Sequence, residues 1–207
     1  MAVSEIQICN LALAMIGAES IRSFSEDNIR ARMCKSFYDY TRDYLLYTFD
    51  WPFARGRKII RRVDPVSLDD DLPEGVYAYS MPADLLVPRE PEGVKTSGSR
   101  LWWRVQGEYL WLQLDVDTTG LYYTRRISNV VLFSEAFIQV VSLGLAVKLA
   151  VPISQDKSIA RTLFQQYTFE RGNAMALEAN MGSEYIAPDD NANLDSYITG
   201  QTNAQLS

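Results

Sequence analysis

The first 54 residues constrain the fold of this chain most, because two helical patterns follow one another there and end at an abrupt aromatic stop. The first pattern begins at Ser4, which can form a capping box with Gln7, and it ends at Gly17. The second begins near residues 25–27 and runs to residues 50–54, DWPFA in one-letter code, where the proline cannot continue a helix. The sequence therefore predicts a short apolar helix and then a long helix.

The long helix is predicted to bury one side. Its apolar and aromatic residues recur at spacings of three and four, which places them on a single face. These residues are Ile29, Met33, Phe37, Tyr40, Tyr44 and Tyr47. We expect this face to pack against a core. We also expect Trp51 to anchor the end of the helix to the β-rich module that follows it.

This region resembles the tail tubular protein A family, whose members are head-to-tail adaptors of short-tailed bacteriophages. The resemblance rests on the first helix, which reads ICNLALAMIGAESI, on a second helix rich in Tyr, Arg and Asp, and on the WPFA stop. It covers residues 5–62. Beyond them it is limited to the order of elements, a β-rich insert followed by two helices.

The resemblance implies a structural protein of the virion that catalyses no reaction. Twelve copies would form a ring that joins the portal protein to the tail nozzle protein and encloses part of the DNA exit channel. The partners would then be the portal, the nozzle, further copies of the chain, and DNA that passes without sequence-specific binding. The resemblance places the protein in the neck of the virion, after assembly in the cytoplasm of the host bacterium.

Residues 55–129 follow a different pattern. Short runs rich in Val, Ile, Tyr and Trp alternate with clusters of Gly, Pro and Asp, which is typical of strands joined by turns. The runs are 57–63, 76–81, 101–105, 108–116 and 121–128. The residues from Leu101 to Leu114 are predicted to form a hairpin that turns near Gln106 and Gly107.

Helical patterns return in the last third of the chain. Ser134 is a good N-cap for an apolar helix that ends at Val151, before a proline. Residues 154–156 can cap a last helix that ends near Gly182, with a kink or break expected at Gly172.

We therefore predict an α+β fold. It consists of a mainly helical four-helix bundle that is interrupted by a small antiparallel β-rich module and followed by an extended C-terminal tail. Residues 1–53 and 131–181 would form the discontinuous bundle, residues 54–130 the β-rich insert, and residues 182–207 a flexible tail.

Composition excludes several classes of function. The net charge of −6 argues against a general nucleic-acid binder, although a DNA channel does not require tight binding. The absence of histidine removes imidazole-based triads and the usual zinc ligand sets. Cys9 and Cys34 follow no metal spacing and are predicted to be small buried residues in a protein made in a reducing cytosol. We predict no catalytic residue, cofactor or metal.

Two other features have plain structural explanations. The apolar stretch 130–153 is interrupted by Glu135, Gln139 and Lys148, so a buried core helix explains it better than a membrane span. The acidic cluster at 69–71, with Glu74, matches no calcium-binding loop and is predicted to be a solvated turn. We expect no membrane partner.

Two groups of residues are candidates for contacts between subunits. The first is a basic run, in which Arg55, Arg57, Lys58, Arg61 and Arg62 follow the aromatic stop. It can contact a neighbouring subunit or DNA phosphates, or it can be a solvated face. The second group is aromatic and consists of Trp102, Trp103 and Trp111, which can serve the core or an interface.

The last 25 residues have four acidic residues and no Lys or Arg. Their spaced apolar residues are Tyr185, Ile186, Leu194, Tyr197 and Ile198. Such a polar segment cannot form its own core, so it is either a frayed terminus or a segment that becomes ordered on a partner. The family resemblance implies that it docks on the portal.

Two alternative functions stay open at this point. One is a carboxylate-dependent hydrolase of cell-wall sugars carried by the virion, since 26 acidic residues are present but nothing in the sequence selects a catalytic pair. The other is an interaction module from a prophage that never enters a virion.

Overall fold

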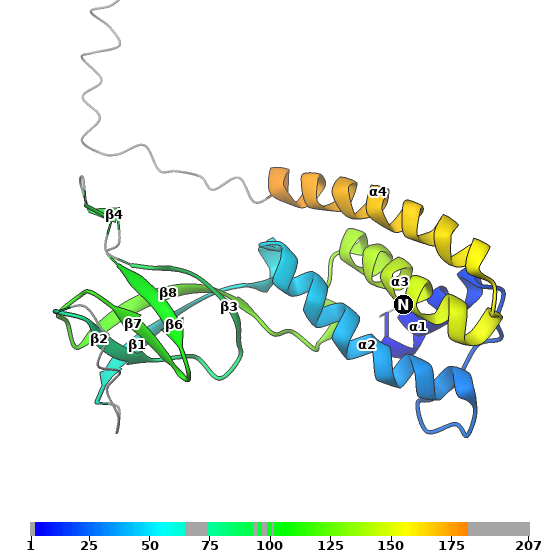
Figure 1. Cartoon of the computed structure of the whole chain (residues 1–207), viewed down its shortest axis with the longest axis horizontal. Helices are drawn as coiled ribbons and strands as arrows, with labels where there is room; N and C mark the ends of the chain where they lie inside the picture. Colours follow the sequence, from blue (N-terminus) through cyan, green and yellow to red (C-terminus); the bar gives the residue numbers. More distant parts are fainter. Residues whose placement is uncertain (1–2, 65–73, 93–94, 97–98, 101, 182–207) are drawn as a thin grey trace, which may run out of the picture.

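The computed structural model describes residues 3–64, 74–92, 95–96, 99–100 and 102–181. It combines four α-helices with a six-stranded antiparallel sheet that curls into a nearly closed barrel. The helices lie at one end of the molecule and the barrel at the other (Figure 1). The α+β class predicted from the sequence is therefore confirmed, whereas the division into folding domains stays a prediction.

The first helix, α1 (Glu5–Met15), begins and ends as predicted. The backbone N–H of Gln7 donates to Ser4 Oγ at 3.2 Å, and the backbone N–H of Ser4 donates to Gln7 Oε1 at 2.8 Å. This reciprocal pair completes the capping box. Gly17 follows the helix with a φ of 69°, in the left-handed region that glycine adopts without strain.

The second helix, α2 (Ile29–Thr48), begins one residue later than predicted. Its N-cap is Asn28, whose side chain accepts a hydrogen bond from the backbone N–H of Ala31 at 2.8 Å. Glu26, inside the predicted cap, instead accepts hydrogen bonds from the backbone N–H groups of Arg22 and Ser23. Glu26 therefore stabilises the loop before α2 and does not cap the helix.

The predicted buried face of α2 is largely wrong. Tyr40 and Tyr47 are each 60% exposed, and Ile29 and Tyr44 are also exposed. The buried face consists of Ala31, Cys34, Tyr38, Thr41, Arg42, Leu45 and Leu46. Both sets recur at spacings of three and four, so periodicity alone does not select between them, and packing against α3 decides which set is buried.

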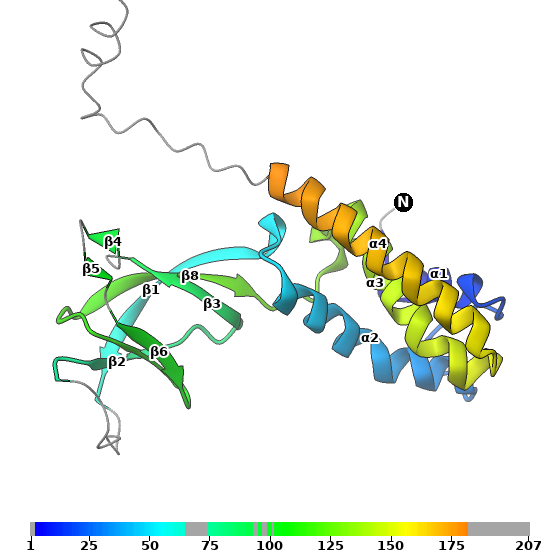
Figure 2. The same ribbon diagram turned by 45° about the horizontal axis from the view of Figure 1, so that its top comes forward.

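The helix α3 (Glu135–Leu149) lies at the centre of the helical part, and α1, α2 and α4 (Lys157–Met181) pack around it (Figure 2). Ser134 caps α3 as predicted by accepting from the backbone N–H of Phe137 at 3.2 Å. The stretch Glu135–Ser154 is long and apolar enough to cross a membrane, but the core of the helical part accounts for it, since nine residues of α3 are buried.

The chain passes from α3 to α4 through a π-helical turn, Ala150–Ser154, and through Gln155, whose φ is 58°. Asp156 then accepts a hydrogen bond from the backbone N–H of Ser158 at 2.7 Å. The predicted break at Gly172 is wrong, because α4 is helical through it. A Cβ at Gly172 would meet nothing within 4 Å, so no neighbour forces the helix to bend there.

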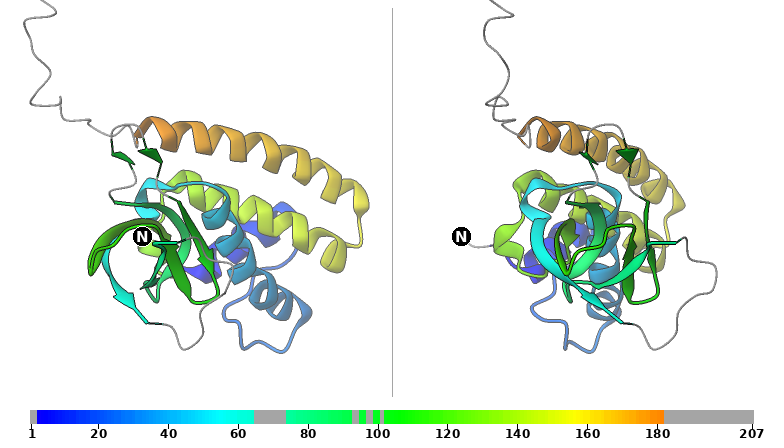
Figure 3. Two further views of the ribbon diagram at one scale, coloured as in Figure 1. Left: turned by 60° about the vertical axis from the view of Figure 1, so that its left-hand side comes forward. Right: turned by 90° about the vertical axis from the view of Figure 1, so that its left-hand side faces the viewer.

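The strands of the barrel lie in the order β3-β8-β1-β2-β7-β6, and every neighbouring pair is antiparallel. They are β1 (Arg55–Val63), β2 (Tyr77–Ser80), β3 (Leu85–Pro91), β6 (Trp103–Gln106), β7 (Tyr109–Leu112) and β8 (Thr118–Arg125). A separate two-stranded pair joins β4 (Lys95–Thr96) to β5 (Ser99–Arg100). Figure 3 shows the barrel strands curling around a common axis.

Four predicted runs became barrel strands, and the hairpin turn is confirmed. Gln106 pairs with Tyr109, and Gly107 opens the two-residue turn between them with a φ of 61°. The fifth run, 101–105, overlaps the barrel strand β6 at residues 103–105. Strand β3 was not predicted, because Pro88 and Pro91 lie within it. It is an edge strand with two register shifts, which is where a strand tolerates proline.

The barrel has a small core of its own. It is formed by Ile60, Tyr79, Leu110, Leu112, Leu121 and Tyr123. The hydroxyl of Tyr79 donates to the carbonyl of Val116 at 2.8 Å and also lies within hydrogen-bonding distance of the Leu114 carbonyl. The phenol of Tyr79 thus connects β2 to the loop between β7 and β8.

Candidate functional site

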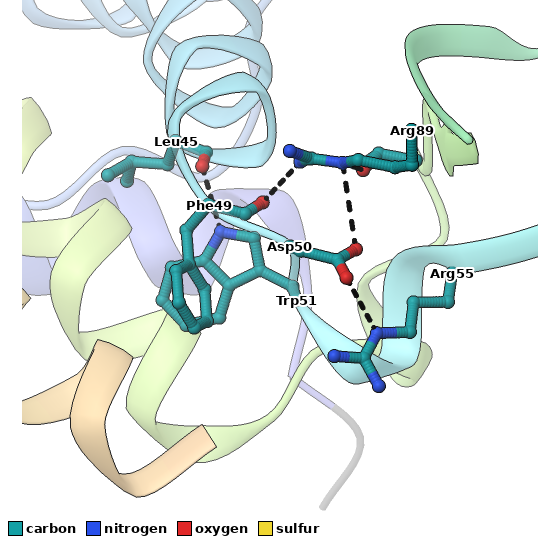
Figure 4. A network of polar contacts seen from close by, with 7 residues as sticks. Leu45, Phe49, Asp50, Trp51, Arg55 and Arg89 are labelled. Carbon is teal, nitrogen blue, oxygen red and sulfur yellow. Dashed lines mark hydrogen bonds and ion pairs between the residues drawn. The ribbon is translucent and has the colours of Figure 1, made fainter. Parts of the chain in front are cut away.

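Trp51, in the aromatic stop at the end of α2, anchors the helix as predicted, but the predicted partner, the β-rich module, is wrong. Trp51 has no exposed surface, and its Nε1 donates to the carbonyl of Leu45 at 2.8 Å (Figure 4). Its ring centre lies 5.1 Å from that of Phe49 and 4.8 Å from that of Phe137 on α3, both nearly edge-on. Trp51 therefore fixes the end of α2 to α3 and not to the barrel.

Phe53 extends this aromatic cluster along the start of α3. Its ring centre is 5.0 Å from that of Phe137 and 5.8 Å from that of Phe133. Phe133 and Phe137 are themselves 4.9 Å apart. Residues distant in sequence thus meet at one point, just before the chain enters the barrel.

A set of polar contacts connects the helical part to the barrel at this point (Figure 4). Arg55 Nε on β1 donates to Asp50 Oδ2 at 2.9 Å. Arg89 on β3 donates to the carbonyl of Phe49 at 3.0 Å and to Thr124 Oγ1 on β8 at 2.8 Å, and its Nε lies 3.7 Å from Asp50 Oδ1. Asp50 therefore pairs with cations from two strands.

A second set of contacts lies beside the first. Arg126, which follows β8, forms an ion pair with Asp43 of α2 at 3.2 Å. Arg42 pairs with the same carboxylate at 2.9 Å, and Arg125 donates to the carbonyl of Phe53 at 3.4 Å. We call the contacts of Asp43, Asp50, Arg89 and Arg126 the junction. It crosses between the two parts at separate points, so it restricts rotation of one part against the other.

Much of the predicted basic run is paired within the chain. Arg57 forms a bidentate pair with Glu92, and one of its two bonds, from Nη2 to Oε2, is 2.9 Å long. A Cβ at Gly120 would lie 2.1 Å from Glu92, so only glycine leaves room for this carboxylate. Arg62 pairs with Asp115 at 2.7 Å and also stacks on a tyrosine ring.

Two cations of the basic run differ from the others. Lys58 and Arg61 are exposed, and neither forms an ion pair within the described part of the chain. With Arg55 at the junction, three of the five predicted residues have acidic partners of their own. This arrangement favours the solvated-face interpretation for most of the run and leaves Lys58 and Arg61 as its accessible charges.

The three tryptophans of the hairpin region differ in exposure. Trp111 is only 3% exposed, so it has almost no surface to offer a neighbouring subunit. Trp103 is half-buried against the barrel core, and Trp102 is half-buried beneath the guanidinium of Arg104, 5.2 Å from the ring centre. Core packing accounts for Trp111 and for most of Trp103.

The largest exposed aromatic side chains lie instead on the helices. Tyr40, Tyr44 and Tyr47 are exposed on α2, and Phe164 and Phe169 are 57% and 67% exposed on α4. We call these five residues the helical aromatic face. Phe164 and Phe169 were missed, because the apolar stripe expected for the last helix consisted of Ile159, Leu163, Tyr167, Met175 and Leu177. The sequence signal that could have identified them is the presence of large aromatic residues at positions off the apolar stripe of the helix.

Part of this face borders a groove of about 550 Å³ between α2 and α4, with α3 as its floor. Tyr40 and Tyr44 stack nearly parallel, with ring centres 6.4 Å apart, and form one wall with Thr41. The remaining lining residues are Gly144, Val147, Lys148, Phe164, Tyr167, Thr168 and Arg171. Burial raises the pKa of Tyr167, so this phenol is neutral at physiological pH.

Gly144 keeps the floor of the groove narrow. A Cβ there would lie 3.0 Å from the ring of Tyr167 and 3.2 Å from Thr41, tighter than an ordinary van der Waals contact. Three helices therefore approach one another closely at this glycine. The result is a closely packed floor with aromatic side chains at the rim.

The remaining predicted features are the C-terminal apolar residues, the acidic cluster, the two cysteines and the absence of a metal site. Tyr185, Ile186, Leu194, Tyr197 and Ile198, like residues 69–71, lie outside the described residues. Cys9 and Cys34 are buried as predicted, and contact with Cys34 together with burial raises the pKa of Cys9. Among the residues that the structure describes, no three His, Cys, Asp or Glu side chains are placed to hold a metal ion.

Comparison with known proteins gives no further identification. No protein-family model matches the chain, and no curated protein is similar to it.

Proposed function

We propose that the chain is one subunit of a head-to-tail adaptor ring in a short-tailed bacteriophage. The ring joins the portal to the tail nozzle and leaves a central channel for DNA. In this proposal the four helices act as an interrupted bundle, the barrel is an insert, and residues 182–207 form an extended tail that attaches to the portal. The resemblance of residues 5–62 to the tail tubular protein A family supports the assignment.

The observation that carries the proposal is the helical aromatic face. Five large aromatic side chains remain exposed although the helical part has a well-filled core. Tyr47 and Phe169, at 60% and 67% exposure, lie outside the groove and are available for flat contacts. Large aromatic side chains that remain exposed are enriched at protein–protein interfaces.

The junction supports the same role. A ring subunit that bridges two assemblies has to keep its two ends in a fixed orientation. Asp43 and Asp50 form ion pairs with strand-side arginines, at 3.2 Å to Arg126 and at 2.9 Å to Arg55. These contacts connect the helical part and the barrel more firmly than the backbone alone does.

The charge pattern is compatible with a channel through which DNA moves. Three of the five cations in the basic run are neutralised by Asp50, Glu92 and Asp115. Lys58 and Arg61 remain accessible, and two cations per subunit give only weak attraction for phosphates. Weak attraction suits passage better than tight binding does.

The test is assembly with the portal of the same phage. Light scattering should find small species for the chain alone and a large complex after portal is added, and electron microscopy should then show a closed ring with about twelve copies, as the resemblance implies. The variant Tyr47→Ser with Phe169→Ser should abolish the ring, whereas the control Tyr122→Ser, on the barrel, should leave it intact. A stable dimer that ignores portal would contradict the proposal.

A further inference from the structure

We propose that the groove between α2 and α4 binds the C-terminal segment of the same chain, residues 183–207. The segment folds back beside α4 and places its apolar side chains between the aromatic walls. This inference does not depend on the adaptor role, because it follows from the chemistry of the groove and of the segment. If the chain is also an adaptor, the segment must leave the groove before it attaches to the portal.

The groove combines aromatic rings with positive charge. The Nζ of Lys148 lies 4.5 Å from the ring centre of Tyr40, and the guanidinium of Arg171 lies 5.6 Å from that of Tyr167. None of the residues that line the groove is acidic. An occupant that fits must therefore bring apolar side chains together with carboxylates.

The C-terminal segment has this composition. It carries Glu184, Asp189, Asp190 and Asp195 and has no Lys or Arg. Apolar residues alternate with these acids, at Tyr185, Ile186, Leu194, Tyr197 and Ile198. Its charge and its apolar content are thus both complementary to the groove.

The segment is also long enough and begins at the right place. It follows α4, whose last residue is Met181, and Arg171 lies ten residues earlier, about 15 Å back along the helix axis. Ile186, five residues after Met181, can span about 17 Å and so reach this end of the groove. Leu194 and the residues after it can reach Phe164 without stretching the chain.

Thr41 supplies a polar group at the floor that a bound segment can use. It is 2% exposed, and its hydroxyl has no hydrogen-bond partner in the structure. Buried polar groups are usually satisfied, and leaving one unpaired costs free energy. A main-chain carbonyl or N–H of a docked segment, reached by rotation about χ1, satisfies this hydroxyl.

The experiment places a nitroxide spin label on the segment of the full-length chain, at Ser196→Cys. Cys9 and Cys34 have no exposed surface, so the label attaches selectively to the new cysteine. Nuclear magnetic resonance should then show paramagnetic broadening of groove amides, such as those of Thr41, Gly144 and Thr168. The amide of Gly107, at the tip of the barrel hairpin, should be unaffected.

Two variants of α4 give a matched comparison. Phe164→Ala should lower the docking equilibrium constant about three- to tenfold, as loss of an aromatic contact does. Phe169→Ala, an equally exposed phenylalanine of the same helix outside the groove, should leave it unchanged. Higher salt should weaken docking, since Lys148 and Arg171 face the acids of the segment.

A mixture in which one copy carries only the spin label and the other only the isotope label distinguishes docking within one chain from docking on a second copy. Broadening that disappears in the mixture supports folding back within one chain. Broadening that persists shows that the segment binds a second copy, which overturns the intramolecular form. Groove amides that never broaden, or equal effects of the two phenylalanine variants, overturn the proposal altogether.

Discussion

The helical part and the barrel are stabilised in different ways. The helical part buries a continuous set of aliphatic and aromatic side chains around α3, including the fully buried Trp51 and Phe137. The barrel has six buried core residues, and its outer surface is crossed by ion pairs such as Arg57–Glu92 and Arg62–Asp115. Apolar burial gives far more free energy than exposed ion pairs do.

This difference indicates where the chain can tolerate change. The barrel has a thin core and two edge strands, so it depends on its hydrogen bonds and on the junction for a defined position. The helical part should keep its fold when surface contacts are removed, whereas the barrel should loosen. Four predictions test this contrast, beginning with the largest effect.

The largest effect is expected at the aromatic stop. Trp51→Ala removes a fully buried indole that contacts Phe49 and Phe137, so the free energy of unfolding should fall by about 3–5 kcal/mol. Denaturant unfolding monitored by helical circular dichroism measures it. The control is Tyr47→Ala, 60% exposed near the same end of α2, which should cost little. A loss below about 1 kcal/mol for Trp51→Ala would mean that this cluster does not stabilise the helical part.

A smaller and more local effect is expected in the barrel. Tyr79→Phe removes the hydroxyl that donates to the Val116 carbonyl and leaves the carbonyl unpaired, which should cost about 1–2 kcal/mol. Hydrogen exchange should quicken for amides of β2 and β7 and stay unchanged in α3. If α3 amides quicken equally, the two parts unfold as one unit and the contrast between them is wrong.

The sequence predicted the positions of most elements because local signals determine them. The capping box at Ser4 and the N-cap at Ser134 fix helix starts through hydrogen bonds within a single turn. Gly107 fixes the hairpin in the same local way. Trp51 was correctly expected to anchor the end of the second helix, although its partner is α3 and not the β-rich module.

The remaining features depend on contacts between distant residues, which a single pattern cannot show. Two stripes of α2 have the same spacing, and only packing against α3 decides that Cys34 and Tyr38 are buried while Tyr40 is exposed. The partner of Trp51 lies 86 residues later, at Phe137. The exposed phenylalanines of α4 and the groove emerge only once α2 and α4 are placed beside α3.

The third prediction concerns the connection between the two parts. Asp50→Asn removes the charge that pairs with Arg55 and Arg89, and because the pair is partly exposed the stability should fall by only about 0.5–1 kcal/mol. The orientation should change more than the stability, so residual dipolar couplings should show increased motion of the barrel relative to the helices. The control Asp115→Asn breaks an ion pair inside the barrel and should leave the relative orientation unchanged. If the residual dipolar couplings of Asp50→Asn equal those of the unaltered chain, the junction does not fix the orientation of the barrel relative to the helices.

The smallest effect is a dependence of barrel stability on pH. The hydrogen bond from Arg57 lowers the pKa of Glu92 below its ordinary value of 4.5. A carboxyl with a lowered pKa in the folded state stabilises the fold above its unfolded pKa, and this contribution is lost as the pH falls through the folded pKa. Glu92→Gln should therefore be slightly less stable than the unaltered chain at pH 7, and the difference should shrink as the pH falls from about 5 toward 3. Thermal unfolding across this range measures it, with Glu108→Gln, at the exposed hairpin turn, as the control. If the difference stays constant with pH, the Arg57–Glu92 pair does not contribute to folding, and the barrel must rely on its small core alone.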